Sequence, residues 1–507
     1  MPARTLMIQG TGSSAGKSLL TAALCRVFAR RGLRVAPFKA QNMSNNAMVC
    51  ADGSEIGRSQ ALQALAAGVP CHADMNPVLL KPEGNGRSQV IVDGKCWETL
   101  AASDYYQRRQ QLWPRVTAAL DRLRDAYDLV IIEGAGSPAE LNLSEQEIVN
   151  MAVARYAQSP VVLVGDIERG GIFAQLLGTL WLLEPADRAL VAGLVVNKFR
   201  GDLRLFDRGV GLLEERGGAP VLGVMPWLDD LTVPEEDSLG LPDGTVGDAA
   251  IADRRLDIVV VRLPHISNFD DFDPLAREPA VRLRYARSVA EVGRPAVVIL
   301  PGTKNTIDDL QWLHRSGIAG RMVQLADQGT VVVGICGGYQ MLGRRLANPA
   351  GLESATTTAK GLGLLPVDTV FAFTKQTFQV RAEILDDTVV PGLKGEFLSG
   401  YEIHAGETTS STGWLKLIRS VSERPETMDG ARSEDGRVWG CYLHGLFEND
   451  RFRRGWLRSL GVEQSAEPHD DCFSSAVVNA SLERLADAVE THIDLDKLES
   501  LIWHQKV

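Results

Sequence analysis

Aromatic residues are scarce in this 507-residue sequence, at 6%, and no apolar run approaches the roughly 18 residues needed to cross a bilayer. The N-terminal stretch MPARTLMIQG has only a short apolar run before its glycines, so no signal peptide is expected. Positive charge is in deficit too. The formal net charge of −11 argues against binding to nucleic acid or to an anionic membrane. An anionic substrate would need a locally basic pocket.

Paired cysteines are also lacking, because none of the seven lies in a C-x-x-C pattern. They are Cys25, Cys50, Cys71, Cys96, Cys336, Cys441 and Cys472. Such a set indicates a reducing compartment, so we expect a cytoplasmic protein without a disulfide framework or a zinc ribbon. The chain is longer than the roughly 250 to 300 residues at which single cores stop growing, so more than one domain is expected.

Short runs rich in Val, Ile and Leu alternate with amphipathic segments in the first half of the chain. The runs are TLMIQG, LRVAPFKA, YDLVIIEGAG, PVVLVGDI, LVAGLVVNKF and APVLGVMP. Runs of this kind are typical of strands covered on both faces of a parallel sheet. Segments 17–31 and 104–127 are long enough to be crossover helices. The pattern predicts a doubly wound α/β fold.

A second α/β series begins at LDIVVVRLP, after an acidic stretch rich in turn-forming residues. We therefore expect an N-terminal domain over residues 1–235, a linker over 236–255 and a second α/β domain over 256–450. Residues 451–507 are mostly helical in pattern and carry no recognisable motif, so they are predicted to form a helical tail.

The stretch GTGSSAGKS, residues 10–18, lies between a predicted strand and a predicted helix, as a phosphate-binding loop does. The strict pattern would place glycine at Thr11, but the glycine comes one residue early, at Gly10. Backbone N–H groups would face phosphate oxygens, Lys17 would reach the outer phosphates and the Ser18 hydroxyl would bind Mg²⁺. The predicted nucleotide-binding residues of this loop are Gly12, Ser13, Ser14, Ala15, Gly16, Lys17 and Ser18. The alternative is a flexible turn that happens to precede Lys-Ser.

Polar residues also end three other predicted strands, at the sheet edge where ligands of doubly wound folds bind. Glu133 could hold Mg²⁺ directly or through water, and Asp166 occupies the same kind of position. Either acid could instead cap the helix that follows. Asn197 and Lys198 close another strand.

The segment TVVVGICGGYQML places Cys336 between small residues at a strand–turn–helix junction. A nucleophile at such a strained turn needs small neighbours, and the helix N-terminus favours the thiolate. His444 ends another apolar run and is the candidate base, which need only be close in space. A buried cysteine is otherwise a small hydrophobic residue, the interpretation we keep for the other six. His444 out of this context could equally be a core residue.

These motifs resemble two enzyme groups. The loop spacing resembles that of dethiobiotin synthetase and its relatives, which use ATP to phosphorylate a carboxylate; this resemblance implies that Asn197 and Lys198 contact the adenine. G-x-C-G-G-x-Q resembles the nucleophile segment of class I glutamine amidotransferases, in which the cysteine attacks the glutamine amide and ammonia leaves. That resemblance implies an oxyanion hole formed by N–H groups of Gly337 and Gly302.

The sequence departs from the amidotransferase pattern at one position. Those enzymes usually have a glutamate two residues after the histidine, where this chain has Leu446. The acid that orients His444 must therefore come from elsewhere. Glu402, in GYEIHAGET, is a candidate, although it could be purely structural.

The whole chain resembles the cobyric acid synthase family of cobalamin biosynthesis. The segments that carry this resemblance are PFKAQNMSNN, GDIERGGIFAQ, VNKFRGD, LPGTKNTIDDL, GICGGYQMLG and YLHGLF. The resemblance implies amidation of four peripheral carboxylates (b, d, e and g) of adenosylcobyrinic acid a,c-diamide to adenosylcobyric acid, through acyl phosphates and ammonia from glutamine. It implies ATP and Mg²⁺ as cofactors and L-glutamine and a corrinoid as small-molecule partners.

The stretch KAQNMSNN, residues 39–46, offers mostly neutral groups that both donate and accept hydrogen bonds. The predicted substrate contacts are Lys39, Gln41, Asn42, Ser44, Asn45 and Asn46. Such groups suit a substrate that loses negative charge at each amidation, and Lys39 would be the cation nearest the acyl phosphate. The alternative is an Asn-rich turn with a helix cap.

Two other functions compete with this one. Cobyrinic acid a,c-diamide synthase shares both domains but amidates two other carboxylates, and QNMSNN favours the first reading. A partitioning-type ATPase with a non-catalytic C-terminal binding domain belongs to another class, and it gives no reason for the Cys336 turn with its distant histidine.

Overall fold

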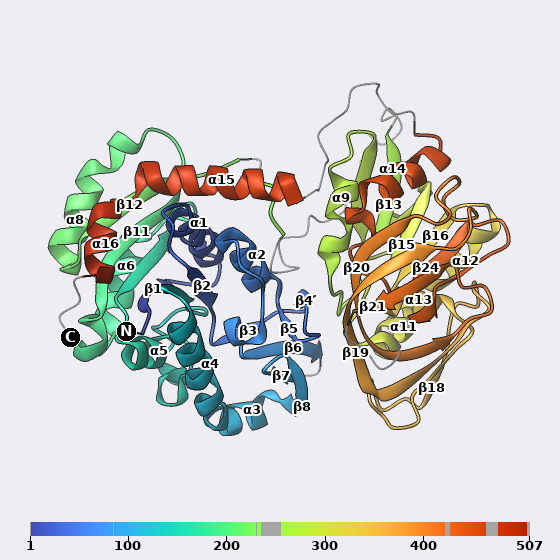
Figure 1. The fold of residues 1–507 in the computed structure, drawn as a ribbon, viewed down its shortest axis with the longest axis horizontal. Helices are drawn as coiled ribbons and strands as arrows, with labels where there is room; N and C mark the ends of the chain where they lie inside the picture. The colour runs from blue at the N-terminus through green and yellow to red at the C-terminus, as the bar shows by residue number, and fades with distance from the viewer. Residues whose placement is uncertain are drawn as a thin grey trace.

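The computed structural model describes residues 2–84, 86–229, 231–234, 255–420, 426–462 and 475–503. The expected linker, 236–255, lies outside the described residues apart from Arg255. Figure 1 shows two lobes, an N-terminal one coloured blue to green and a C-terminal one coloured green to orange. No helix in the described ranges is long and apolar enough to cross a membrane.

The six apolar runs of the first half form one parallel sheet, which confirms the predicted doubly wound fold. In spatial order its strands are β12 (Val221–Pro226), β11 (Val191–Phe199), β10 (Val161–Asp166), β1 (Arg4–Gly10), β9 (Leu129–Glu133) and β2 (Val35–Phe38). The chain passes from β9 to β10 across β1, so the strand order reverses at the carboxyl end of β1. Ligands of such sheets bind at this point.

Successive residues of β1 enter different cores, since side chains alternate along a strand. Leu6 and Ile8 pack beneath α1 (Lys17–Arg30), whereas Met7 packs on the opposite face. Helices α5 (Met151–Ala157), α6 (Ile172–Leu182) and α8 (Asp207–Gly217) bury residues in the same core as Met7. The short helix α7 (Pro185–Arg188) follows α6 in the chain.

The single crossover helix predicted over 104–127 is wrong. The segment forms α3 (Ala102–Arg108), a 3-10 turn (Arg109–Leu112) and α4 (Trp113–Ala126). Pro114 lacks the N–H that a helix interior needs, so it is accommodated only in the first turn, where α4 begins.

A second, smaller sheet that the sequence did not reveal follows β2. Its order is β3 (Gln41–Met43), β6 (Val78–Gly84), β7 (Arg87–Val92) and β8 (Lys95–Ala101). The hairpin β4 (Ala47–Val49) and β5 (Glu55–Gly57) and the helix α2 (Arg58–Ala67) lie between β3 and β6 in the chain. Figure 1 shows these elements on the side of the N-terminal lobe that faces β19 and β20.

The C-terminal lobe contains a second α/β sheet, as predicted. Its order is β14 (Val281–Ala286), β13 (Leu256–Val261), β15 (Val297–Leu300), β16 (Val331–Ile335), β24 (Val438–Cys441) and β23 (Ala431–Arg432). Its helices are α9 (Asp273–Ala276), α10 (Val289–Val292), α11 (Thr306–Arg315), α12 (Ile318–Asp327) and α13 (Gly337–Leu342).

A further sheet of this lobe is built around the long strands β19 (Asp368–Ile384) and β20 (Phe397–Thr409), which pair antiparallel. Its other strands are β17 (Arg345–Ala347), β18 (Thr358–Lys360), β21 (Leu415–Arg419) and β22 (Glu426–Asp429). Tyr401 and Ile403 of β20 share a small core with Ala47, Val49 and Leu79 of the N-terminal lobe. The two lobes are therefore joined by apolar packing.

The segment after residue 450 divides between the two lobes. Helix α14 (Asp450–Ser459) buries Phe452 and Trp456 in the C-terminal core. Helices α15 (Ser475–His492) and α16 (Leu495–Trp503), drawn in red in Figure 1, pack on the N-terminal lobe, where Leu482 and Val489 are buried against α1. Helices α15 and α16 therefore belong to the N-terminal lobe.

Candidate active sites

The loop between β1 and α1 wraps around the Lys17 ammonium. Lys17 Nζ donates to the carbonyl oxygens of Gly12 (2.7 Å) and Gly136 (3.0 Å). A Cβ atom on Gly10 would lie 3.0 Å from Lys17 Nζ, so the early glycine leaves room for the lysine. An ammonium at the N-terminus of α1, beside a loop of small residues, is suited to bind phosphate.

Glu133, at the end of β9, is a fully buried carboxylate at the centre of a polar cluster. Its Oε1 accepts from Ser18 Oγ (2.7 Å) and pairs with Lys39 Nζ (2.9 Å). Its Oε2 accepts from Gln63 Nε2 (2.6 Å). These contacts are all to side chains and do not cap a helix. A hydroxyl and a carboxylate are oxygen ligands of the kind that Mg²⁺ takes, so Ser18 and Glu133 fit such an ion.

Asp166, the other acid expected at the metal, forms an ion pair with a lysine. Its Oδ2 lies 2.9 Å from Lys198 Nζ, and its Oδ1 accepts from the N–H of Glu168 (2.8 Å). Helix α6 begins only at Ile172, so Asp166 holds the preceding turn and does not cap the helix.

Asn197 and Lys198 contact the backbone of the phosphate loop. Asn197 Nδ2 donates to the carbonyl of Ala15 (2.9 Å), and Lys198 Nζ donates to that of Ser14 (2.7 Å). The backbone of Lys198 has a positive φ of 66°, and its side chain also reaches Asp166 Oδ2. These two residues therefore fix the shape of the loop.

The predicted substrate segment, residues 39–46, is held by hydrogen bonds to its side chains. The Oε1 of Gln41 accepts from the Tyr105 hydroxyl, and Asn42 Nδ2 donates to Gln60 Oε1 (3.0 Å). Ser44 Oγ accepts from the N–H of Asn46 (3.0 Å), a local bond of the kind the turn alternative implies. Asn45 Oδ1 is buried and has no hydrogen-bond partner among the described residues.

Cys336 occupies a strained turn between β16 and α13, as the spacing of small residues indicated. Its backbone has φ 52° and ψ −111°, a conformation that L-residues rarely adopt. A Cβ atom on Gly338 would lie 1.8 Å from the Leu300 carbonyl oxygen, so only glycine fits behind the turn. The thiol sits in a pocket wall, 3.7 Å from the Ile403 carbonyl oxygen.

His444 lines the same pocket and is oriented by Asp271. Its Nδ1 lies 2.6 Å from Asp271 Oδ2, and the N–H of Gly445 donates to the other oxygen (2.8 Å). The Tyr401 ring stacks on the imidazole, with centroids 5.2 Å apart. Burial lowers the pKa of His444, but the Asp271 carboxylate and Cys336 outweigh it and raise the pKa to about 10. A protonated imidazole beside a thiol stabilises the thiolate.

The suggestion that Glu402 orients His444 is wrong. The Glu402 carboxylate pairs with Arg419 (Nη2, 3.0 Å) and His404 (Nε2, 3.3 Å), which gives it the structural role left open above. Asp271 lies in the segment HISNFDDFD, 173 positions before His444. Only its acidic composition signalled this segment, because the contact depends on the tertiary fold.

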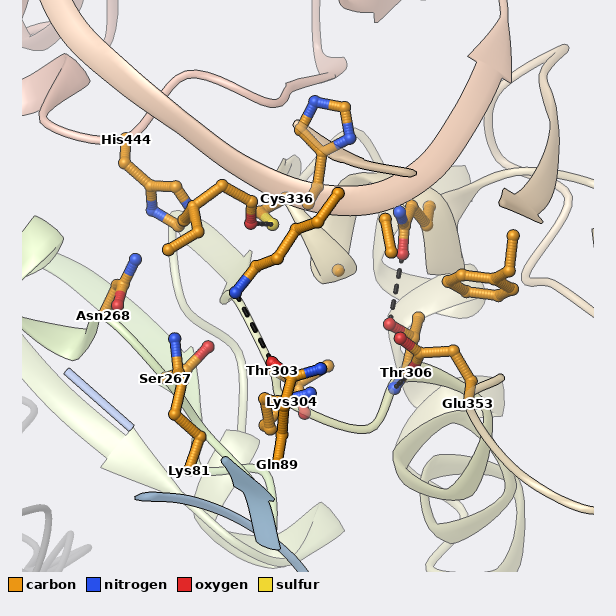
Figure 2. A pocket seen from close by; sticks show the side chains of 17 residues that line it. Lys81, Gln89, Ser267, Asn268, Thr303, Lys304, Thr306, Cys336, Glu353 and His444 are labelled. Atoms are coloured by element: carbon orange, nitrogen blue, oxygen red, sulfur yellow. Dashed lines mark hydrogen bonds between the residues drawn. The ribbon is translucent and has the colours of Figure 1, made fainter. Parts of the chain in front are cut away.

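The pocket next to Cys336 is lined by residues of both lobes, and Figure 2 shows its labelled side chains. Lys304 and Glu353 come from the C-terminal lobe, and Lys81 and Gln89 come from the small sheet of the N-terminal lobe. Lys81 and Lys375 both pair with Glu55, at 2.6 and 2.5 Å.

The two glycines expected at an oxyanion hole lie beside this pocket. A Cβ atom on Gly302 would stand 3.3 Å from His444 Cε1, and one on Gly337 would stand 3.2 Å from the backbone nitrogen of Thr303. The two glycines therefore belong to turns that meet next to Cys336 and His444.

Comparison with known proteins gives a family match for each of the two lobes. Residues 6–239 match the CobQ/CobB/MinD/ParA nucleotide binding domain, and residues 257–452 match the CobB/CobQ-like glutamine amidotransferase domain. Cobyric acid synthase of Chloroflexus aurantiacus is 54% identical over 96% of this chain and 99% of its own length. The chain belongs to the cobyric acid synthase family.

Other members of the family are similar over the same extent. Those of Herpetosiphon aurantiacus and of Dehalococcoides mccartyi strain CBDB1 are 51% and 45% identical, and the matches cover 100% and 99% of this chain and 99% of each relative. The chain is thus an ATP-dependent glutamine amidotransferase, and the amidotransferase domain decides against a partitioning-type ATPase.

Proposed function

We propose that this enzyme amidates the b, d, e and g carboxylates of adenosylcobyrinic acid a,c-diamide and so forms adenosylcobyric acid. Each cycle uses ATP to convert one carboxylate to an acyl phosphate, which ammonia from glutamine then attacks. Phosphate leaves as the carboxamide forms. The observation that carries the proposal is the pocket at Cys336, whose wall includes Lys81 and Gln89 of the nucleotide-binding lobe.

In the nucleotide-binding half, Lys17 and the loop N–H groups bind the ATP phosphates, and Asn197 and Lys198 hold the loop in shape and border the adenine. Ser18, Glu133 and Asp166 hold Mg²⁺, and Lys198 pairs with Asp166. When bound, this ion neutralises charge that develops on the transferred phosphoryl group. Lys39, now paired with Glu133, stabilises the acyl phosphate.

The corrinoid is held by the neutral side chains of residues 39–46. An amide or hydroxyl pairs with a carboxylate before the reaction and with a carboxamide after it. The buried Oδ1 of Asn45 is an acceptor that a substrate carboxamide N–H can satisfy.

In the glutaminase half, Cys336 attacks the side-chain amide of glutamine, and the thiolate becomes a thioester as the C–N bond breaks. His444, oriented by Asp271, donates the proton with which ammonia leaves, and it then removes a proton from the water that hydrolyses the thioester. The N–H groups of Gly337 and Gly302 stabilise the oxyanion.

The proposal is tested by incubating the protein with Mg-ATP, glutamine and adenosylcobyrinic acid a,c-diamide and by following the corrinoid by mass spectrometry. Four successive exchanges of OH for NH₂ are expected. Cobyrinic acid, offered in a parallel reaction, distinguishes the rival a,c-diamide synthase. Amidation of cobyrinic acid at its a and c positions, with the a,c-diamide unchanged, would overturn the proposal.

A further inference from the structure

Helix α2 (Arg58–Ala67) reaches both candidate active sites. On the nucleotide side, Gln63 donates to Glu133 Oε2 (2.6 Å), and Gln60 Nε2 lies 3.5 Å from the same oxygen. Glu133 in turn contacts Ser18 and Lys39. One face of this short helix therefore supports the carboxylate at the centre of the nucleotide site.

Arg58, the first residue of α2, extends in the other direction, into the C-terminal lobe. Its Nε lies 2.8 Å from Asp270 Oδ2, and its Nη2 lies 3.1 Å from Glu448 Oε1. The side chain is only 11% exposed. This arginine is therefore almost completely enclosed at the junction of the two lobes.

The two acids that Arg58 binds lie in turns that contain Asp271 or closely follow His444. Asp270 and Asp271 are neighbours in the 3-10 turn Phe269–Phe272, and Asp271 orients His444. Glu448 ends the 3-10 turn Leu446–Glu448, which begins two residues after His444. By bridging these turns, Arg58 holds together the segments on which the Asp271–His444 contact depends.

Arg58 also acts on Asp270 and Asp271 through its positive charge. Asp270 and Asp271 are adjacent buried carboxylates, 3% and 4% exposed, and would repel each other. Burial raises the pKa of Asp270 above its ordinary value, and the Arg58 guanidinium opposes that rise. Arg58 therefore places a positive charge against these adjacent carboxylates, which lie beside His444.

We propose that Arg58 is a positioning residue for the glutaminase, and that α2 links the glutaminase rate to occupancy of the nucleotide site through Gln60, Gln63 and Glu133. A ligand that moves Glu133 moves α2 and thereby Arg58. This proposal rests on the proposed function, which assigns glutamine hydrolysis to Cys336 and carboxylate activation to the other site. Coupling of this kind makes ammonia release depend on an activated acceptor.

The test uses Arg58→Met, which removes the charge at similar length, Arg58→Lys, which keeps a cation, and Arg30→Met as the matched control. Arg30 also joins distant segments, since it pairs with Asp487 (2.8 Å) of α15, but it touches neither site. Glutamate release is measured with and without Mg-ATP and the corrinoid. Amidation driven by ammonium is measured separately, because it needs no glutaminase.

Arg58→Met is expected to lower kcat for glutamate release about tenfold and to abolish its response to Mg-ATP and corrinoid. The KM for glutamine stays within about twofold, because Arg58 does not line the Cys336 pocket. Arg58→Lys restores part of kcat, and Arg30→Met behaves as the wild type. Amidation driven by ammonium stays within about twofold in every variant.

Equal loss of the ammonium-driven reaction and of glutamate release in Arg58→Met would overturn the proposal, because Arg58 would then support the whole fold. An unchanged response of glutamate release to Mg-ATP would overturn the link through α2. If the wild type leaves the corrinoid unchanged even with ammonium, the proposed function fails. Glutamate release with Mg-ATP alone still tests Arg58 in that case.

Discussion

The two candidate sites are built in different ways. The nucleotide site is mostly local: residues 10–18 are one loop between β1 and α1, and Glu133 lies on the strand next to β1. The glutaminase site takes Cys336, His444 and Asp271 from three separate turns, and part of its pocket wall comes from the other lobe. A local site depends on its own motif, whereas a dispersed site depends on how the two lobes pack.

The largest expected effect comes from removing the nucleophile Cys336, which separates the activity of one site from that of the other. Cys336→Ala is expected to lower glutamine-dependent amidation by about 10⁴-fold or more, because no thioester can form. Amidation driven by ammonium should remain, since it bypasses this pocket. Both rates are measured by mass spectrometry of the corrinoid. Loss of both activities would show that the sites are not separable in this way.

The acid of the glutaminase site gives the next largest effect. Asp271→Asn is expected to lower kcat for glutamate release about 10³-fold, because the neutral amide neither fixes the tautomer of His444 nor stabilises its protonated form. Glu402→Gln is the matched control, since Glu402 pairs with Arg419 and His404 instead. A larger loss in Glu402→Gln than in Asp271→Asn would reverse the assignment.

Removing the phosphate-loop lysine should lower the rate of amidation equally with glutamine and with ammonium. Lys17→Ala is expected to lower amidation about 10²-fold with glutamine and with ammonium alike, because acyl phosphate formation precedes both reactions. The measurement compares the amidation rates of this one variant with glutamine and with ammonium. A loss confined to glutamine would place Lys17 in the glutaminase pathway.

The smallest expected change is a shift in the titration of His444. Its pKa of about 10 means that the imidazole keeps its proton as the pH rises through the ordinary value of 6.5. Asp271→Asn removes the main stabilising charge, so the proton should be lost at lower pH than in the wild type. Carbon-13 NMR of histidine-labelled protein follows the ring, with His444→Gln to assign its signal. Identical titrations in wild type and Asp271→Asn would contradict the pairing.

Features encoded by local patterns could be predicted from the sequence. The apolar runs became the strands of the two α/β sheets, and the small residues around Cys336 anticipated its strained turn. Features that depend on tertiary packing could not. Asp271 is far from His444 in sequence, and Gln60, Gln63 and Arg58 acquire their partners only when α2 docks between the lobes. The sheet of β3, β6, β7 and β8 was missed because its strands are short or polar.

The central claim is that the two sites carry out one reaction, in which the nitrogen of glutamine becomes the nitrogen of the corrinoid amides. Glutamine labelled with nitrogen-15 in its side-chain amide, supplied with Mg-ATP and the a,c-diamide substrate, tests it directly. The label is expected in every new carboxamide made by the wild type. When unlabelled ammonium is added with the labelled glutamine, Cys336→Ala is expected to make carboxamides without label. Glutamine hydrolysis by the wild type without label in the corrinoid would contradict it.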